Sequence, residues 1–276
     1  MILQMMNVFL PLVTYPYLIR VLGKEIYGLI VFAQAIVSYL VVFVNFGFNI
    51  SATKEVSVHR EDKEKLSEIV SSVLIIKGLV FIFIFVLLII AIKIIPKAYD
   101  IRYLLYLSMW LSFSAFIFPI WYFQGIEKMK YITFINFISR VFFILFVFLL
   151  IHSSKDYLLV PAINGAGAII SGFISVYIVI FFHKIKFNFQ PIRTLKKYIK
   201  ISLPLVTSDI FSNIYVNTNK LIVGTFLGMA EVSYYDLADR VVRLINIPIT
   251  MIGQTIFPKI EAEKNVRFAL KMLKNT

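Results

Sequence analysis

Eight apolar segments, each long enough to cross a lipid bilayer, constrain this chain more than any other feature. A helix needs about 20 mostly apolar residues to cross a hydrocarbon core of about 30 Å. Apolar residues make up 60% of the chain and charged residues 16%, whereas soluble domains carry about 25% charged residues. We therefore predict an all-α, polytopic membrane protein, a helical bundle with about eight transmembrane helices. The segments cover roughly residues 1–19, 27–50, 69–95, 103–123, 131–151, 158–182, 201–227 and 232–257.

The distribution of basic residues predicts how the chain lies in the membrane. Most of the Lys and Arg residues outside the apolar segments fall around residues 51–68, around 183–200 and after residue 257. Because cytoplasmic loops collect such residues, we expect these regions and the N terminus to be cytoplasmic. The same bias accounts for the net charge of +13. We expect no nucleic-acid partner, since the sequence holds no motif for one.

Polar positions recur along the chain at an offset of 205 residues. In the second segment, Gln34, Ser38, Asn45 and Asn49 are spaced to share one face of a helix. In the eighth segment the equivalent positions are also polar, and they are Asp239, Arg243, Thr250 and Gln254. Asn246 adds one more polar position to this segment.

This repeat predicts two lobes that run the same way through the membrane, because six segments separate the copies. Transporters use such parallel repeats, with a binding site between the lobes. Alternatively, the two segments share only the residues that membrane helices use for packing. We predict a first six-helix lobe over residues 1–183, a basic cytoplasmic linker over 184–200, and the start of an incomplete second lobe over 201–276.

Ionisable side chains inside the segments are costly in a bilayer and normally face a cavity or a partner. Lys77 and Arg140 each lie about nine residues from a cytoplasmic helix end, which is about 13 Å into the membrane. Asn136 precedes Arg140 by one turn and gives it a polar approach. For Lys77 a second interpretation stays open, in which the side chain reaches back to the inner interface.

The intramembrane charges as a whole are mostly cationic, which suits an anionic cargo such as a phosphate or diphosphate group. Acidic residues precede basic ones by four positions in two pairs, Asp236 with Arg240 and Asp239 with Arg243, and such pairs can also simply neutralise each other. We predict a cationic, substrate-binding cavity and a polar stripe beside it. The cationic residues are Arg20, Lys77, Arg140, Lys220, Arg240 and Arg243, and the polar ones are Gln34, Ser38, Asn45, Asn49, Asn136, Asn246 and Gln254.

The sequence offers no constellation for catalysis, a metal or a cofactor. It has no cysteine, and its three histidines are scattered at positions 59, 152 and 183. We therefore expect no catalytic residues, no metal site, no cofactor and no enzyme activity.

Four motifs in order resemble the Wzx-type polysaccharide flippases, which transport O-antigen and capsule repeat units and belong to the MATE-like, MurJ-related MOP exporter superfamily. They are Pro16 to Gly28, Asn45 to Glu55, Phe123 to Tyr131 and Phe257 to Lys259. The resemblance covers essentially the whole chain. Members of this family usually have twelve or more spans, so the resemblance also implies that the second lobe is incomplete here.

The resemblance implies a multi-pass protein of the bacterial inner membrane that takes part in lipopolysaccharide and other surface polysaccharide biosynthesis. Its substrate would be an undecaprenyl-diphosphate-linked oligosaccharide, and its partners membrane lipids, a polysaccharide polymerase and chain-length proteins. The family also suggests coupling to an ion gradient, for which the acidic candidates are Asp209, Asp236 and Asp239.

Two other functions stay open at this point. A MATE-type drug or metabolite exporter would share the fold, but the cationic balance argues against a cavity for cationic drugs. A membrane-embedded polysaccharide polymerase would need a sizeable outer loop or clustered carboxylates, and the predicted outer loops are short.

Overall fold

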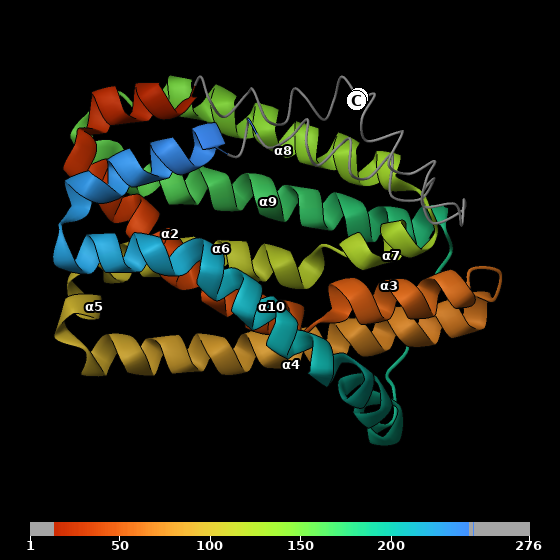
Figure 1. Cartoon of the computed structure of the whole chain (residues 1–276). Coiled ribbons are helices and arrows are strands. Elements are labelled where there is room, and N and C mark those ends of the chain that lie inside the picture. Colours follow the sequence, from red (N-terminus) through yellow and green to blue (C-terminus); the bar gives the residue numbers. More distant parts are fainter. Residues whose placement is uncertain (1–13, 243–244, 246–276) are drawn as a thin grey trace, which may run out of the picture. The chain divides into compact units, whose positions relative to one another are not determined.

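The computed structural model describes residues 14–242 and 245, and all regular elements in that part of the chain are helices (Figure 1). The chain divides into two compact units, residues 1–233 and 234–276. Eleven helices of the first unit have defined bounds among the described residues, and a further helical stretch covers residues 14–22. The α-helices are α2 (Lys24–Asn45), α3 (Phe48–Val58), α4 (Lys63–Ile94), α5 (Pro96–Asp100), α6 (Arg102–Ile117), α7 (Ile120–Gly125), α8 (Met129–Leu150), α9 (Leu159–Tyr177) and α10 (Ile192–Phe226), with a 3₁₀ helix η1 (Ser154–Leu158) and a π-helix η2 (Ile178–Phe182).

Five helical stretches among the described residues are long and apolar enough to cross a membrane: Lys24–Val58, Lys63–Ile94, Arg102–Gly125, Met129–Leu150 and Ser154–Phe182. They coincide with the second to sixth predicted segments and confirm a polytopic, all-α membrane protein. The seventh segment lies within α10, which is not among these five. The first and eighth segments lie partly outside the described residues, so the total of eight stays a prediction.

Two of the membrane-spanning stretches are interrupted. Between α2 and α3, Phe46 and Gly47 both take left-handed backbone conformations, with φ of 48° and 68°. Between α6 and α7 the chain is extended at Phe118 before Pro119, because proline disfavours a helical residue in front of it. The break at Gly47 separates Asn49 from the helix that carries Gln34, Ser38 and Asn45. The prediction of one continuous helix for these four residues is therefore wrong.

The two breaks divide the buried side chains into two apolar clusters. One cluster includes Val44 of α2 and Met109 of α6, while the other includes Phe48 of α3 and Trp121 of α7. Helix α4 contributes to both clusters, with residues up to Ile76 in the second and residues from Ile84 onward in the first. Each cluster therefore sits at one end of the same helical unit.

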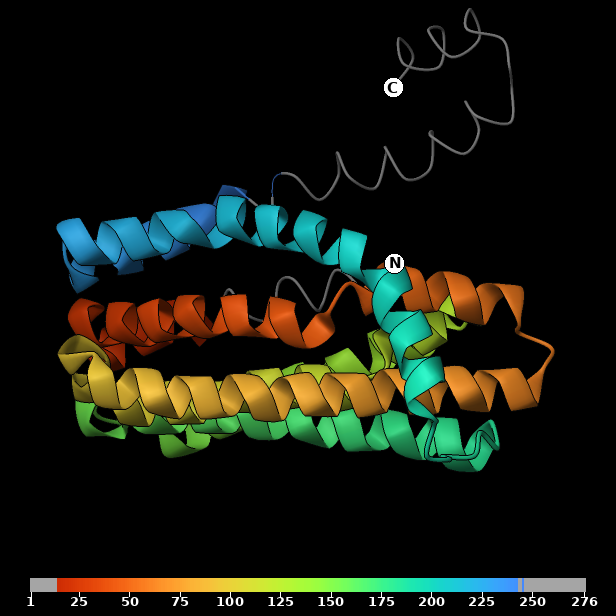
Figure 2. The same ribbon diagram turned by 90° about the horizontal axis from the view of Figure 1, so that it is seen from below.

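A linker without regular structure connects η2 to α10 and is fastened to α4. The backbone N–H groups of Lys186 and Asn188 donate hydrogen bonds to the hydroxyls of Ser67 and Ser71, at 3.1 and 3.0 Å. Helix α10 contains Pro204, whose ring removes a backbone donor and bends a helix; Figure 2 shows α10 bent along its length. The linker and the start of α10 are thus held against the first helices of the chain.

Candidate functional site

A polar cavity of about 290 Å³ lies among α6, α8 and α9, within the membrane-spanning stretches. Its polar lining comes from one face of each helix, at spacings of three and four residues that place side chains together. The polar residues are Tyr15, Ser114 of α6, Asn136, Ser139 and Arg140 of α8, and Asn164 and Ser171 of α9. We call this space the Arg140 cavity.

Arg140 is the only charged residue that lines this cavity in the described part of the chain. An arginine guanidinium offers donors in a planar fork that matches two oxygens of a phosphate. Among the described residues, the side chains of Arg140, Asn136 and Asn164 make no hydrogen bond with another residue. Their polar groups are therefore available to a ligand, and with no carboxylate in the lining the cavity favours an anion.

Two of the serines, by contrast, have local partners. The Ser114 hydroxyl donates to the carbonyl of Ala168 at 3.3 Å, and the Ser171 hydroxyl donates to Ile135 and Gly167 carbonyls at 3.3 and 3.0 Å. These bonds join the helices that wall the cavity. Sequence reasoning found Asn136 and Arg140 but missed Ser139, Asn164 and Ser171; the spacing of Asn164, Ala168 and Ser171 on one helical face is the signal that could have found the α9 residues.

Lys77 occupies a different place. Its side chain is almost fully buried at the two helix breaks, where Nζ donates to Asn45 Oδ1 at 3.2 Å and to the carbonyl of Ala115 at 2.5 Å. Asn45 is the last residue of α2, and Ala115 lies in the last turn of α6, where carbonyls lack intrahelical partners and the helix dipole is negative. Lys77 therefore joins two helix ends, and it does not line the Arg140 cavity.

The polar side of α2 meets α10 instead of an open cavity. Ser38 and Asn213 exchange hydrogen bonds of 3.5 Å, and the hydroxyls of Tyr39 and Thr218 lie 2.6 Å apart. Gln34 is half-buried on the same helix. Further along, the hydroxyls of Ser51 in α3 and Ser202 in α10 lie 2.6 Å apart and are buried. We call these contacts the α10 seam.

The remaining candidates are dispersed. Arg20 is exposed, Asn49 and Asp209 are half-buried, and Lys220 is buried in α10. In the second unit Asp236 is buried and accepts a hydrogen bond of 2.6 Å from Arg240 Nε, which confirms the first acid-base pair, while Asp239 is half-buried. The other three predicted residues, Arg243, Asn246 and Gln254, lie outside the described residues.

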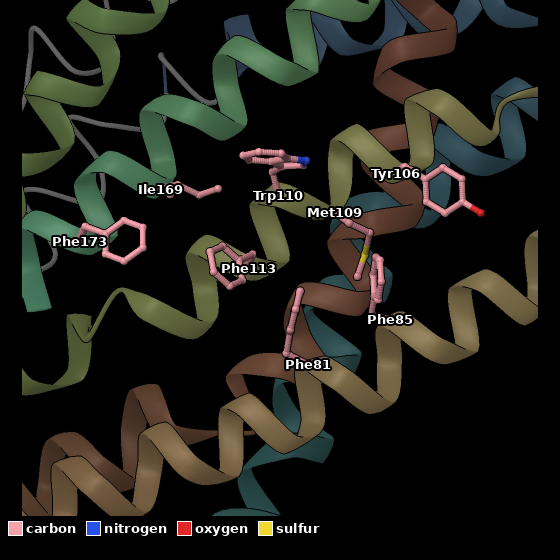
Figure 3. Close-up of a pocket in the computed structure, with 8 residues that line it drawn as sticks. All are labelled: Phe81, Phe85, Tyr106, Met109, Trp110, Phe113, Ile169 and Phe173. Carbon is pink, nitrogen blue, oxygen red and sulfur yellow. The ribbon is translucent and has the colours of Figure 1, made fainter. Parts of the chain in front are cut away.

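The opposite face of α6 and α9 is apolar. Figure 3 shows Trp110, Phe113, Ile169 and Phe173 around a cavity of about 530 Å³ that α4 completes with Phe81 and Phe85. Residues 14–242 and 245 hold no group of three His, Cys, Asp or Glu side chains that could bind a metal ion. Of these two cavities, the Arg140 cavity is the one with the chemistry to bind a polar, anionic group.

Comparison with known proteins identifies the family. The sequence model described as "Polysaccharide biosynthesis protein" matches residues 1–262. The chain belongs to this family. The match confirms the family predicted from the four motifs, and it covers all of the helices described above.

Two curated relatives of this chain carry the name "Putative O-antigen transporter". The relative from Escherichia coli (strain K12) is 26% identical over 261 residues, which cover 95% of this chain and 63% of the relative. The one from Shigella dysenteriae is 26% identical over 269 residues, 96% of this chain and 67% of the relative. The chain thus spans about two thirds of the length of these relatives. No solved structure matches it significantly.

Proposed function

We propose that this protein is a flippase that moves undecaprenyl-diphosphate-linked oligosaccharide repeat units across the bacterial inner membrane for surface polysaccharide biosynthesis. The observation that carries the proposal is the Arg140 cavity, a polar and cationic space among membrane-spanning helices. The names of the two relatives as O-antigen transporters support it. The N terminus would be cytoplasmic, as the distribution of basic residues predicts.

The physical requirement for such a flippase is a polar path. Moving a charged sugar headgroup through hydrocarbon without hydrogen-bonding partners costs many times the thermal energy. In the Arg140 cavity the guanidinium would bind the diphosphate, and the amides of Asn136 and Asn164 would offer donors and acceptors to sugar hydroxyls. No covalent bond has to form or break. Asp209, Asp236 and Asp239 stay the candidates for ion coupling, and a polysaccharide polymerase and chain-length proteins the expected partners.

Replacing Arg140 tests the proposal. A hydrogen bond to a charged group contributes about 1.5–3 kcal/mol, so Arg140→Ala should lower the transport rate by about 10- to 100-fold, and Arg140→Lys should keep part of the activity. The measurement is the amount of surface polysaccharide at equal levels of inserted protein. Arg102→Ala, which removes a half-buried arginine at the start of α6 that does not line the Arg140 cavity, is the control. Normal polysaccharide in the Arg140→Ala strain would contradict the assignment of the cavity.

Complementation tests the function itself. This chain, and separately a version extended through the predicted remaining helices, would be expressed in a bacterium that lacks its polysaccharide flippase, and outer-leaflet lipid-linked sugar would be measured. Rescue by at least the extended version is the expected result. Absence of rescue by two correctly inserted proteins, together with resistance to a toxic drug, would instead indicate a drug exporter.

A further inference from the structure

The apolar cavity of Figure 3 continues into a second cavity of about 520 Å³. The two share Phe113 of α6 and Phe173 of α9 in their linings, so they form one groove along α4. The second cavity extends the groove to Leu74 of α4 and to Phe187 of the linker. We call this combined space the α4–α9 groove.

The length of the α4–α9 groove matches one leaflet of a bilayer. Along α4 its lining runs from Leu74 to Phe85, and eleven helical steps of 1.5 Å correspond to about 16 Å. Half of a hydrocarbon core of about 30 Å is about 15 Å. The groove is therefore long enough for one acyl chain of a phospholipid.

Positive charge surrounds the end of the groove that the linker closes. Phe187 is flanked by Lys186, and Lys184 precedes it by three residues; both lysines are exposed. Between residues 184 and 200 the sequence has no Asp or Glu. The hydrogen bonds from the linker to Ser67 and Ser71 hold it one to two turns inside the start of α4. The lysines are thus fixed close to the depth at which a lipid headgroup would lie.

We propose that the α4–α9 groove and the linker form a binding site for an anionic phospholipid. One acyl chain lies in the groove, and the headgroup phosphate binds Lys184 and Lys186. Charge complementarity selects an anionic lipid over a zwitterionic one, since each basic residue near an anionic membrane surface contributes about fivefold in affinity. The groove and the Arg140 cavity use opposite faces of α6 and α9, so a lipid in this site leaves the Arg140 cavity open.

Native mass spectrometry tests the site. The protein is reconstituted in vesicles with equal amounts of phosphatidylglycerol and phosphatidylethanolamine, extracted gently, and weighed with its bound lipids. The wild type should retain one phosphatidylglycerol with about 30-fold preference. Lys184→Gln/Lys186→Gln should reduce the preference to about one to one, whereas Lys93→Gln/Lys97→Gln, which removes two exposed lysines near the far end of α4, should keep it.

A second pair of variants tests the groove. Ile169→Trp fills the cavity of Figure 3 and should abolish lipid retention. Ile170→Trp places the same ring on the neighbouring exposed position of α9, outside both cavities, and should retain lipid. Equal elution of the two variants from size exclusion shows that both fold. The proposal is overturned if the wild type retains both lipids equally, if Ile169→Trp binds as well as Ile170→Trp, or if added polyprenyl phosphate displaces the phosphatidylglycerol.

Discussion

At the scale of single residues, Lys77 and His183 show how burial decides what a polar group does. The chain buries Lys77 but gives its ammonium two acceptors, Asn45 Oδ1 and the Ala115 carbonyl. Both ring nitrogens of His183 are buried and lack a hydrogen-bond partner among the described residues, while its ring packs against Tyr122, Phe123 and Tyr131. The buried amine of Lys77 thus has hydrogen-bond partners, whereas the buried ring of His183 has none among the described residues and disfavours a charge.

Removing the ammonium of Lys77 should destabilise the helix ends that it joins. In Lys77→Met the Asn45 and Ala115 oxygens lose their donor, and each unsatisfied buried acceptor costs about 1–3 kcal/mol. We expect a net loss of about 1–3 kcal/mol in the free energy of unfolding, because the cost of burying the charge is removed at the same time. Thermal unfolding in detergent measures it, with Lys93→Met on the exposed end of α4 as the control. A more stable Lys77→Met protein would mean that burying the charge outweighs its hydrogen bonds.

His183 should make the protein less stable in mild acid. Burial, with a smaller contribution from the charge of Lys128, lowers the pKa of His183 below its ordinary value of about 6.5. The unfolded chain therefore binds a proton before the folded protein does, so stability is complete above about pH 6.5 and falls as the pH drops toward the lowered pKa. Melting temperatures between pH 7.5 and 5 should fall more in the wild type than in His183→Phe. Parallel curves for the two proteins would show that another group controls the acid sensitivity.

At the scale of the helices, the breaks after Asn45 and after Ile117 position Lys77 and separate the two apolar clusters. Gly47 is required at the first break for two reasons: its φ is +68°, and a Cβ there would lie 2.9 Å from the Ser202 carbonyl oxygen of α10. Gly23 also has a positive φ, of +82°, but nothing lies within 4 Å of its added Cβ. Both glycines therefore have a positive φ, but only Gly47 is also crowded by a neighbouring helix.

Alanine at these two glycines should separate backbone strain from helix packing. Gly23→Ala should cost about 1–3 kcal/mol, because a φ of 82° with a ψ of 156° is a backbone conformation that essentially only glycine adopts. Gly47→Ala should cost about 1–2 kcal/mol for its left-handed backbone and about 1–3 kcal/mol in addition, because α10 has to move away from the new methyl group. Thermal unfolding of both variants in the same detergent measures the difference. Equal losses would indicate that α10 does not press on Gly47.

The sequence predicted the second to sixth spans well because apolar length is a local property, and it predicted that Asn136 and Arg140 share a helical face for the same reason. It did not predict that α2 breaks at Phe46 and Gly47, nor that Asn45 hydrogen-bonds Lys77. Both depend on how α2, α4 and α6 lie against one another. Spacing along one helix carries no information on that arrangement, which is also why Asn164 was missed as a neighbour of Arg140.

At the scale of the whole molecule, the α10 seam lies across the predicted boundary between the two lobes. Ser51 belongs to the predicted first lobe and Ser202 to the predicted second, and their hydroxyls lie 2.6 Å apart. Alternating access requires lobes to move relative to each other. If the boundary lies at residues 184–200, this contact opens during each transport cycle.

A cross-link across the seam tests that boundary in a chain that has no native cysteine. Ser51→Cys/Ser202→Cys should form a disulfide on oxidation, stop transport, and recover transport when reduced. In the control Ser57→Cys/Ser202→Cys, the first cysteine is displaced by six residues, about 9 Å along α3, and should not cross-link. Full transport by the cross-linked protein would show that residue 202 moves together with α3, which would contradict a lobe boundary at residues 184–200.

The two hydrogen-bond acceptors of Lys77 are synthesised at different times. Helix α4 enters the membrane when Asn45 is already there, but Ala115 lies 38 residues further along the chain. At about 5–20 residues per second, α6 follows about 2–8 s later. During that interval a newly made α4 holds a lysine with one of its two acceptors absent, so its apolar residues alone must keep the helix in the bilayer. The second contact of Lys77 therefore forms only after α6 has been made, so the final position of α4 depends on a helix that is synthesised after it.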